Sequence, residues 1–222
     1  MKTDYNIFLE DYDTQTKNVE QETRNAFYQH LPELRDKNVL DVGCGSGHDA
    51  KHFSNLGARV SGIDISARSI EMARASVNGT FLVADMHTLP FADSTFDVVT
   101  SWYALQAATD TQRVLDEMFR VAKPGGTIVY LAKHPIRSML EGYVNDGLAN
   151  YFSGETVTSK IFNGTITLRE PNHQLANYFS PATLGRARLE AFEEGMDFPA
   201  SQNTLPSLRH PTYIIMRWRK EK

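Results

Sequence analysis

The sequence predicts an α/β fold: a doubly wound, mostly parallel seven-stranded sheet with helices on both faces and an insertion after the fifth strand. Apolar runs of strand length alternate along the chain with segments whose apolar residues recur at helical spacing. The strand segments are nearly continuous apolar runs, as expected for parallel strands that are buried on both faces and joined by right-handed crossovers. The first strand leads into a turn with glycine at positions 43, 45 and 47. Sheets of this kind bind ligands at the carboxyl ends of their strands.

The first half of the chain supplies four strands and the helices around them. An amphipathic helix is predicted over residues 14–34, where apolar residues recur at helical spacing. Strands are predicted at 39–42, 59–65, 80–84 and 96–102. Helices are predicted at 47–56 and 66–77, and Ser66 is the expected cap of the second.

The second half is less regular. A helix is predicted at 109–122, and the Lys123-Pro-Gly-Gly126 stretch predicts a turn into a fifth strand at 127–132. The remaining predicted elements are a helix at 181–194 and strands at 195–198 and 212–218.

Residues 135–180 break the alternation and form the predicted insertion over the carboxyl edge of the sheet. Within it, the Asn163-Gly164 pair lies between two alternating segments and predicts a β-hairpin. With 222 residues, the chain is predicted to form a single domain with its own core and one sizeable insertion.

The bulk composition narrows the classes of function. With 222 residues, 41% hydrophobic and 23% charged, the chain is an ordinary globular protein, and its net charge of −4 argues against a broad nucleic-acid-binding face. Cys44 is the only cysteine, which excludes an intrachain disulfide and a cysteine-based zinc site. A polar start and the lack of a long apolar run predict a cytoplasmic protein without a membrane span. His48 and His52 have the spacing of a zinc helix, but Asp49 replaces the expected Glu, so no metal site is expected.

The glycine turn after the first strand favours an anionic group as its ligand. Gly43, Gly45 and Gly47 can take backbone angles closed to other residues and let a ligand lie against the main chain. The helix that follows presents unpaired N–H groups and a positive dipole end. The dinucleotide-binding pattern would need glycine where His48 stands, and a P-loop would need a Lys-Ser/Thr pair. Neither pattern asks for a carboxylate on the strand, where this chain has Asp41.

Four stretches resemble the class I S-adenosylmethionine-dependent methyltransferases. Residues 41–47 are similar to the family's first motif, and Asp64 and Asp85 stand at the ends of the second and third strands, as the family requires. Residues 120–126 match the family's turn before the fifth strand. The resemblance covers residues 35–135 and implies a Rossmann-like fold with S-adenosyl-L-methionine as the cofactor.

Two finer details resemble one branch of that family. Leu89-Pro-Phe91 and Phe96-Asp-Val-Val99 are similar to the branch that contains ubiquinone-biosynthesis and other small-molecule methyltransferases. The function implied is methyl transfer to nitrogen, oxygen or carbon of a small-molecule acceptor. Two alternatives stay open: a catalytically silent S-adenosylmethionine-binding protein that acts through partner contacts, and a protein or RNA methyltransferase.

The resemblance implies a role toward the cofactor for each matched residue. Asp41 would receive the ammonium of the amino-acid end, Asp64 would accept both ribose hydroxyls, and Asp85 would accept the adenine amine. Any one of these carboxylates alone could be a helix cap or a turn residue, but three at successive strand ends favour a ligand. The residues expected at the cofactor are Asp41, Gly43, Cys44, Gly45, Gly47, Asp64, Ile65, Asp85, Met86, Ser101, Trp102 and Tyr12.

A general base is needed only if the acceptor arrives protonated. The candidates at the carboxyl edge are Tyr103, His134 and His173. His134 is the first choice, because it follows a strand and can titrate near neutral pH, although it could equally be held by backbone groups beside Pro135. For His173 a role in a turn is as good an interpretation.

The ends of the domain are expected to close the site. Residues 1–34 are predicted to form a helix and a lid in which Tyr12 covers the cofactor, since the family's N-terminal segment commonly does so; an aromatic anchor on the sheet is the alternative. The insertion at 135–180 would cover the acceptor. The expected partner is a small-molecule acceptor, without nucleic acid or membrane, and the chain is expected to act as a monomer or homodimer.

Overall fold

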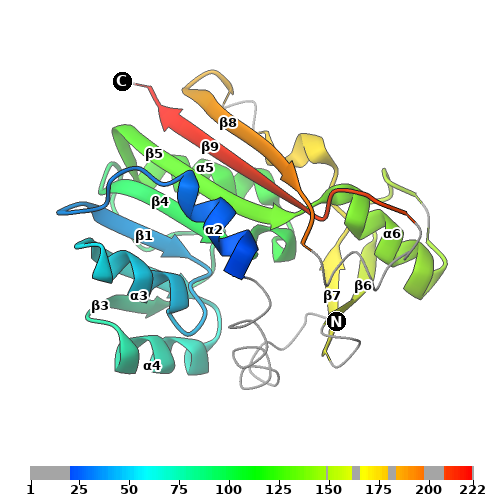
Figure 1. The fold of residues 1–222 in the computed structure, drawn as a ribbon, viewed down its shortest axis with the longest axis horizontal. Helices are drawn as coiled ribbons and strands as arrows, with labels where there is room; N and C mark the ends of the chain where they lie inside the picture. The colour runs from blue at the N-terminus through cyan, green and yellow to red at the C-terminus, as the bar shows by residue number, and fades with distance from the viewer. Residues whose placement is uncertain (1–20, 149, 162–165, 180–183, 198–207, 222) are drawn as a thin grey trace.

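A computed structural model describes residues 21–148, 150–161, 166–179, 184–197 and 208–221 (Figure 1). Seven strands form one sheet in the order β3-β2-β1-β4-β5-β9-β8. In chain order their bounds are β1 (Asn38–Val42), β2 (Arg59–Asp64), β3 (Gly79–Val83), β4 (Phe96–Trp102), β5 (Ala122–Lys133), β8 (Ala187–Gly195) and β9 (Tyr213–Lys220). Strands β1 to β5 pair in parallel, whereas β9 pairs antiparallel with both β5 and β8. The predicted mostly parallel sheet of seven strands is confirmed.

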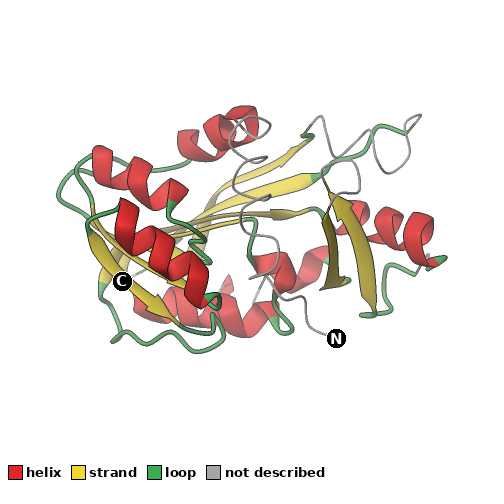
Figure 2. Cartoon of the chain, turned by 90° about the horizontal axis from the view of Figure 1, so that it is seen from below, coloured by secondary structure: helices red, strands yellow, loops and turns green. Residues whose placement is uncertain are grey.

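Helices cover both faces of this sheet (Figure 2). They are α2 (Gln21–Gln29), α3 (His48–Asn55), α4 (Ala67–Ser76) and α5 (Thr111–Val121). The first three bury Phe27, Phe53 and Ile70 in one apolar cluster, and α5 buries Leu115 and Met118 in another. The sheet is therefore covered by apolar helix faces on both sides, which explains why its strands are apolar in near-continuous runs.

The central strands show this double burial residue by residue. Val98 of β4 belongs to the cluster under α2 and α3, while its neighbour Val99 belongs to the cluster under α5. In β5 the same alternation separates Val129 from Ile128. Because successive side chains of a strand point to opposite faces, both faces of these strands carry apolar residues.

The N-terminal helix is shorter than predicted at its carboxyl end. The described part of the predicted helix at 14–34 is α2, which ends at Gln29. Pro32 disfavours a helical backbone at Leu31, which explains the early end. Residues 1–20, including Tyr12 and most of the predicted lid, lie outside the described residues.

The predicted helix at 181–194 is wrong, because Ala187–Gly195 is strand β8 at the edge of the sheet. Its Ala and Glu residues favour a helix locally, but eight of its residues pair with β9, from Ala187 with Lys220 to Gly195 with Tyr213. Glu190 sits at an irregularity in this pairing and accepts hydrogen bonds from Arg217 (2.9 Å) and Arg219 (3.2 Å) of β9. Pairing with a distant strand has overridden local propensity.

Between β5 and β8 the chain forms a helix and a hairpin that lie beyond the carboxyl end of β5 (Figure 1). The elements are α6 (Pro135–Asp146), β6 (Thr156–Ile161), β7 (Ile166–Pro171) and the short 3-10 helix η2 (Leu175–Tyr178). The antiparallel pairing of β6 with β7 confirms the predicted hairpin, although its turn at 162–165 lies outside the described residues. Helix α6 was not predicted. Its signals were Pro135 at the first turn and Gly147 with φ 71° at the carboxyl end.

Candidate active site

The turn between β1 and α3 is held in a backbone conformation that favours glycine. Gly43, Gly45 and Gly47 have φ angles of 74°, 51° and 87°. A Cβ atom on Gly43 would lie 2.3 Å from the Cβ of Ala104, which follows β4, so the turn packs directly against that loop. A Cβ atom on Gly45 would meet nothing within 4 Å. The main chain at Gly45 therefore faces open space at the carboxyl edge of the sheet.

Asp64 joins this turn to the end of β2. Its Oδ2 accepts the backbone N–H of Gly45 at 2.9 Å, and its Oδ1 accepts the N–H of Ser66 at 2.9 Å. Burial raises the pKa of Asp64, and these backbone N–H groups partly oppose the rise. Ile65, next in the chain, exposes 55% of its surface and is available to a ligand. The structure thus brings together the glycine turn and the second-strand carboxylate, as the sequence predicted.

Asp41 lies deeper than the other two carboxylates. It is buried on β1, and Thr100 of β4 donates to its Oδ1 at 3.2 Å. Burial, followed by the negative charge of Asp49, raises the pKa of Asp41 well above its usual value. A cation near Asp41 would offset both effects.

Asp85 follows β3 in a loop with Met86, and its side chain is half exposed. Its Oδ1 accepts the backbone N–H of His87 at 2.9 Å and lies 2.6 Å from the Nδ1 atom of the same residue. Met86 is half-buried and packs against the apolar cluster under α5. The loop is therefore anchored on one side while its carboxylate stays accessible.

The end of β4 contains two residues in different surroundings. Ser101 is fully buried and donates to the carbonyl oxygen of Val42 at 2.8 Å, so it ties β4 to β1 under the turn. Trp102 is buried too, yet its Nε1 donor has no hydrogen-bond partner within the described part of the chain.

Burial raises the pKa of the Cys44 thiol, so this residue is a small neutral group in the glycine turn.

A buried ion pair under the site was missed by the sequence analysis. Arg24 of α2 donates through Nη1 to both carboxylate oxygens of Asp49 on α3, at 2.5 and 2.6 Å, and Tyr28 donates to the same carboxylate. The Arg24 guanidinium also lies 3.7 Å from the ring centre of Trp102. The helical spacing of Arg24 relative to Phe27 was the available signal, since it places Arg24 on the buried face of α2.

Tyr103, directly after β4, has the left-handed φ angle of 47°, which is unusual for a bulky residue. Its hydroxyl donates to Asp197 Oδ2 at 3.2 Å, and Arg137 Nη1 lies 3.6 Å from the same oxygen. Thr212 donates to the other oxygen of Asp197. The tyrosine hydroxyl is thus tied to Asp197, whose carboxylate also contacts Arg137 of α6 and Thr212 just before β9.

His134 is buried at the start of α6, where it serves as the N-cap. Its Nδ1 accepts the backbone N–H of Ile136 at 3.0 Å, so the proton lies on Nε2, which donates to Glu194 at 2.8 Å. Burial lowers the pKa of His134, although the hydrogen bond to Glu194 and its negative charge act to raise that pKa. Both ring nitrogens are engaged, which supports the backbone-held alternative; the role of general base stays a prediction.

His173 lies in a different place, beside a cavity of about 370 Å³. The cavity is lined by Thr109, Asp110, Thr111, Gln112, Gly154, Pro171, Asn172, His173, Gln174 and Asn177. Its volume falls in the range of small-molecule sites. His173 Nε2 lies 3.2 Å from the carbonyl oxygen of Gln106, and Thr111 Oγ1 contacts the ring at 3.3 Å. Burial lowers the pKa of His173, which keeps the ring neutral near pH 7.

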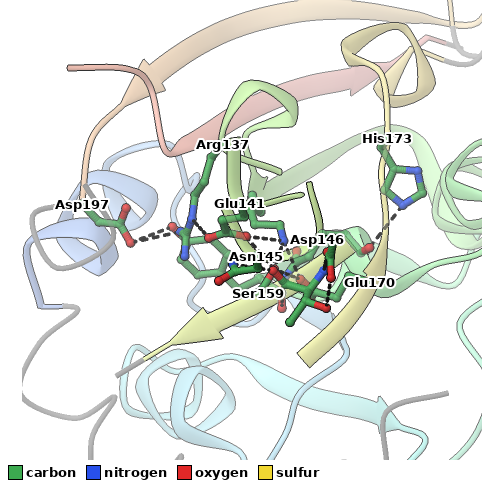
Figure 3. A network of polar contacts seen from close by, with 12 residues as sticks. Arg137, Glu141, Asn145, Asp146, Ser159, Glu170, His173 and Asp197 are labelled. Atoms are coloured by element: carbon green, nitrogen blue, oxygen red, sulfur yellow. Dashed lines mark hydrogen bonds and ion pairs between the residues drawn. The ribbon is translucent and has the colours of Figure 1, made fainter. Parts of the chain in front are cut away.

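A buried polar network holds the hairpin and α6 to the end of β5 (Figure 3). Lys133 donates to Glu141 at 3.0 Å, to Glu170 at 2.6 Å and to Ser159 at 2.6 Å, and Arg137 donates to Glu141 at 2.8 Å. Burial alone would raise the pKa of Glu141, but the charges of Lys133 and Arg137 outweigh it and hold that pKa at about 2. Four elements are thereby linked through one lysine, beyond the sheet edge that carries the glycine turn.

Comparison with known proteins identifies the fold family. Residues 40–130 match the family model described as a methyltransferase domain, and this span runs from β1 through the glycine turn to β5. Residues 40–130 form a methyltransferase domain. The family predicted from the first-strand motif and the three strand-end carboxylates is therefore confirmed.

Curated relatives of the methyltransferase domain act on different acceptors. The chain is 34% identical over 122 residues to malonyl-[acyl-carrier protein] O-methyltransferase from Yersinia pestis, covering 54% of this chain and 45% of that protein. It is 30% identical over 164 residues to ubiquinone biosynthesis O-methyltransferase from Thiobacillus denitrificans, covering 71% and 65%. The chain spans about half the length of the first of these relatives.

Solved structures share the fold of the methyltransferase domain at lower identity. A crystallised S-adenosylmethionine dependent methyltransferase from Mesorhizobium loti aligns with a TM-score of 0.67 at 20% identity, over 88% of this chain and 96% of that one. At this identity the likeness concerns the fold.

Every helix within the described ranges is too short or too polar to cross a bilayer. Those same ranges contain no group of three His, Cys, Asp or Glu side chains arranged to hold a metal ion.

Proposed function

We propose that this protein is an S-adenosylmethionine-dependent methyltransferase that moves a methyl group to nitrogen, oxygen or carbon of a small-molecule acceptor. The observation that carries the proposal is the 2.9 Å bond between Gly45 N and Asp64 Oδ2, at a turn whose main chain faces open space. The match of residues 40–130 to the methyltransferase domain supports it.

The residues at the strand ends suit the parts of the cofactor. A sulfonium supplies the activated methyl group, and the protein supplies binding and alignment. Asp64 would hold the ribose hydroxyls, the exposed Ile65 would cover the adenine, and Asp85 and the N–H of Met86 would meet its polar edge. Toward the methionine end, Asp41 would face the ammonium.

A buried hydrogen-bond donor without a partner supports placing the methionine end of the cofactor beside the end of β4. The buried Nε1 of Trp102 has no hydrogen-bond partner among the residues the structure describes, and a buried donor left unpaired costs about 1–3 kcal/mol. A carboxylate at the end of β4 would satisfy this donor. The Arg24 guanidinium over the same indole ring adds positive charge there.

For the acceptor we favour the region around Tyr103 and the cavity beside His173. Both adjoin the loop that joins β4 to α5, next to the turn that packs on Ala104. Residues 135–180 would then cover the acceptor, held in place by the Lys133 network. His173, neutral and in contact with the cavity, is the better placed of the two histidines to receive a proton. Alignment of acceptor and sulfonium would supply much of the rate, as in other transfers between bound reactants.

The acidic net charge of −4 supports an acceptor other than nucleic acid, and we propose that the chain works as a monomer or homodimer. Calorimetric titration with S-adenosyl-L-methionine tests cofactor binding, and a radiolabelled methyl-transfer screen over phenols, amines, carboxylates and acidic carbon compounds tests turnover. Binding with turnover supports the proposal. Tight binding without turnover on any acceptor class would favour a silent cofactor-binding protein, and the absence of binding would contradict both.

A further inference from the structure

His87 connects the loop after β3 with the start of α5. On one side, its backbone N–H and its Nδ1 both meet Asp85 Oδ1, at 2.9 and 2.6 Å. On the other side, its Nε2 lies 3.3 Å from the backbone nitrogen of Asp110 and 3.3 Å from Thr109 Oγ1. The imidazole is mostly buried, whereas the Asp85 carboxylate is half exposed. One ring thus touches a strand-end carboxylate and a helix start at once.

These contacts fix which nitrogen of His87 carries the proton. A backbone N–H can only donate, so Nε2 must accept from Asp110 and is unprotonated in the neutral ring. The proton then lies on Nδ1, and Nδ1–H donates to Asp85. With two donors converging on Oδ1, the plane of the Asp85 carboxylate has a defined orientation.

The main chain of this loop does not depend on the imidazole alone. Arg113 of α5 donates through Nε to the carbonyl oxygen of His87 at 2.9 Å, and its Nη2 lies 3.4 Å from Thr88 Oγ1. Arg113 thus holds the path of residues 87 and 88, while the His87 ring acts on the Asp85 side chain. The two roles can be separated by substitution.

We propose that His87 is a positioning residue that preorients the Asp85 carboxylate toward the exocyclic amine of adenine and thereby favours an adenosyl cofactor over one without that amine. The inference rests on the proposed function, in which Asp85 meets the adenine edge. A carboxylate on a half-exposed loop would otherwise have to be ordered when the ligand binds, and preorganisation removes that cost. The expected effect is on the difference in affinity between ligands that carry different bases. The adenine amine can donate a hydrogen bond to Asp85, whereas a carbonyl at the same ring position can only accept one.

The test compares S-adenosyl-L-homocysteine with S-inosyl-L-homocysteine, in which a carbonyl replaces the amine, by calorimetric titration of the full chain. His87→Leu removes the ring donor, whereas His87→Asn keeps an N–H at the position of Nδ1. We expect the adenosyl-over-inosyl affinity ratio to fall roughly fivefold or more in His87→Leu, the equivalent of one lost hydrogen bond, and to stay within about twofold of the unchanged protein in His87→Asn. Thr109→Val is the matched control, since it alters the Nε2 side and leaves the Asp85 contact.

The variants separate the possible failures. Asp85→Ala must itself lower the ratio; if it does not, the assignment of Asp85 to the adenine edge fails. If Asp85→Ala lowers the ratio and His87→Leu, still folded by circular dichroism, does not, the positioning role is overturned while the cofactor site stands. An equal loss in His87→Leu and His87→Asn also overturns it, because the effect would then follow the Nε2 contact with α5.

Discussion

The backbone nitrogen of Gly45 donates to Asp64 Oδ2 over 2.9 Å, so the turn after β1 and the end of β2 form one unit at the carboxyl edge of the sheet. Gly43 N and Cys44 N reinforce it by donating to the carbonyl oxygen of Ile63 at 2.8 and 2.9 Å. This unit is preformed, since its hydrogen bonds involve only the protein. Ligand contacts made on it need little reorganisation of the chain.

Gly43 and Gly45 are expected to tolerate alanine differently. Gly43→Ala adds a Cβ atom 2.3 Å from the Cβ of Ala104 as well as a strained φ angle, and we expect it to lower the free energy of unfolding by about 3 kcal/mol. Gly45→Ala adds only the strain, about 1 kcal/mol. Urea unfolding measures both. Ala104→Gly should recover part of the loss in Gly43→Ala and none in Gly45→Ala; equal losses at the two glycines would contradict the close packing of the turn.

The strands whose position follows from the local sequence pattern were predicted from the sequence. Val39–Val42 and Phe96–Trp102 carry apolar residues on both faces, and burial between two helix layers keeps that pattern visible in the chain. Strand β8 was predicted as a helix because its stabilising partner is β9, and no local signal records that pairing. The start and end of α6 did carry signals, in Pro135 and Gly147, but they were obscured by the irregular composition of the segment.

The candidate site likewise contains residues whose positions could be predicted from the sequence and residues whose contacts could not. The positions of Gly45 and Asp64 follow from strand ends that the sequence marks, and the structure brings them into hydrogen-bonding contact. The Arg24–Asp49 pair could not be found from spacing alone, because whether a charged residue on a helix is buried depends on a counterion 25 positions away. His134 follows a strand as predicted, yet the start of α6 uses its ring as a cap.

Loss of one member of the Arg24–Asp49 pair is expected to destabilise the domain strongly. Arg24→Met leaves the buried Asp49 carboxylate without its cation, which should cost about 3–5 kcal/mol in free energy of unfolding. Chemical denaturation followed by fluorescence measures this loss. The double variant Arg24→Met with Asp49→Leu should recover a large part of it, because no buried charge then remains unpaired. A double variant as unstable as the single one would show that the packing of Arg24 on Trp102 matters more than the ion pair.

Glu141 gives the domain an acid-sensitive contribution to stability. Its pKa of about 2 in the folded chain lies below the ordinary value of 4.5, so on acidification the unfolded chain takes up the proton first. The contribution is present above pH 4.5, and it is lost as the pH falls toward 2. Urea unfolding as a function of pH should therefore show a shallower decline over this window in Glu141→Gln, from a lower starting stability. Parallel profiles for Glu141→Gln and the unchanged protein would refute the prediction.

The most direct test of the cofactor site is the affinity for S-adenosyl-L-homocysteine of Asp64→Ala, measured by calorimetric titration beside Glu71→Ala, an exposed carboxylate variant on α4. We predict that Asp64→Ala weakens binding by about 1–3 kcal/mol, roughly fivefold to 150-fold, because a charged acceptor of hydrogen bonds is lost. Glu71→Ala should bind as the unchanged protein does. An Asp64→Ala variant that is folded and binds with undiminished affinity would contradict the assignment of this strand end to the cofactor.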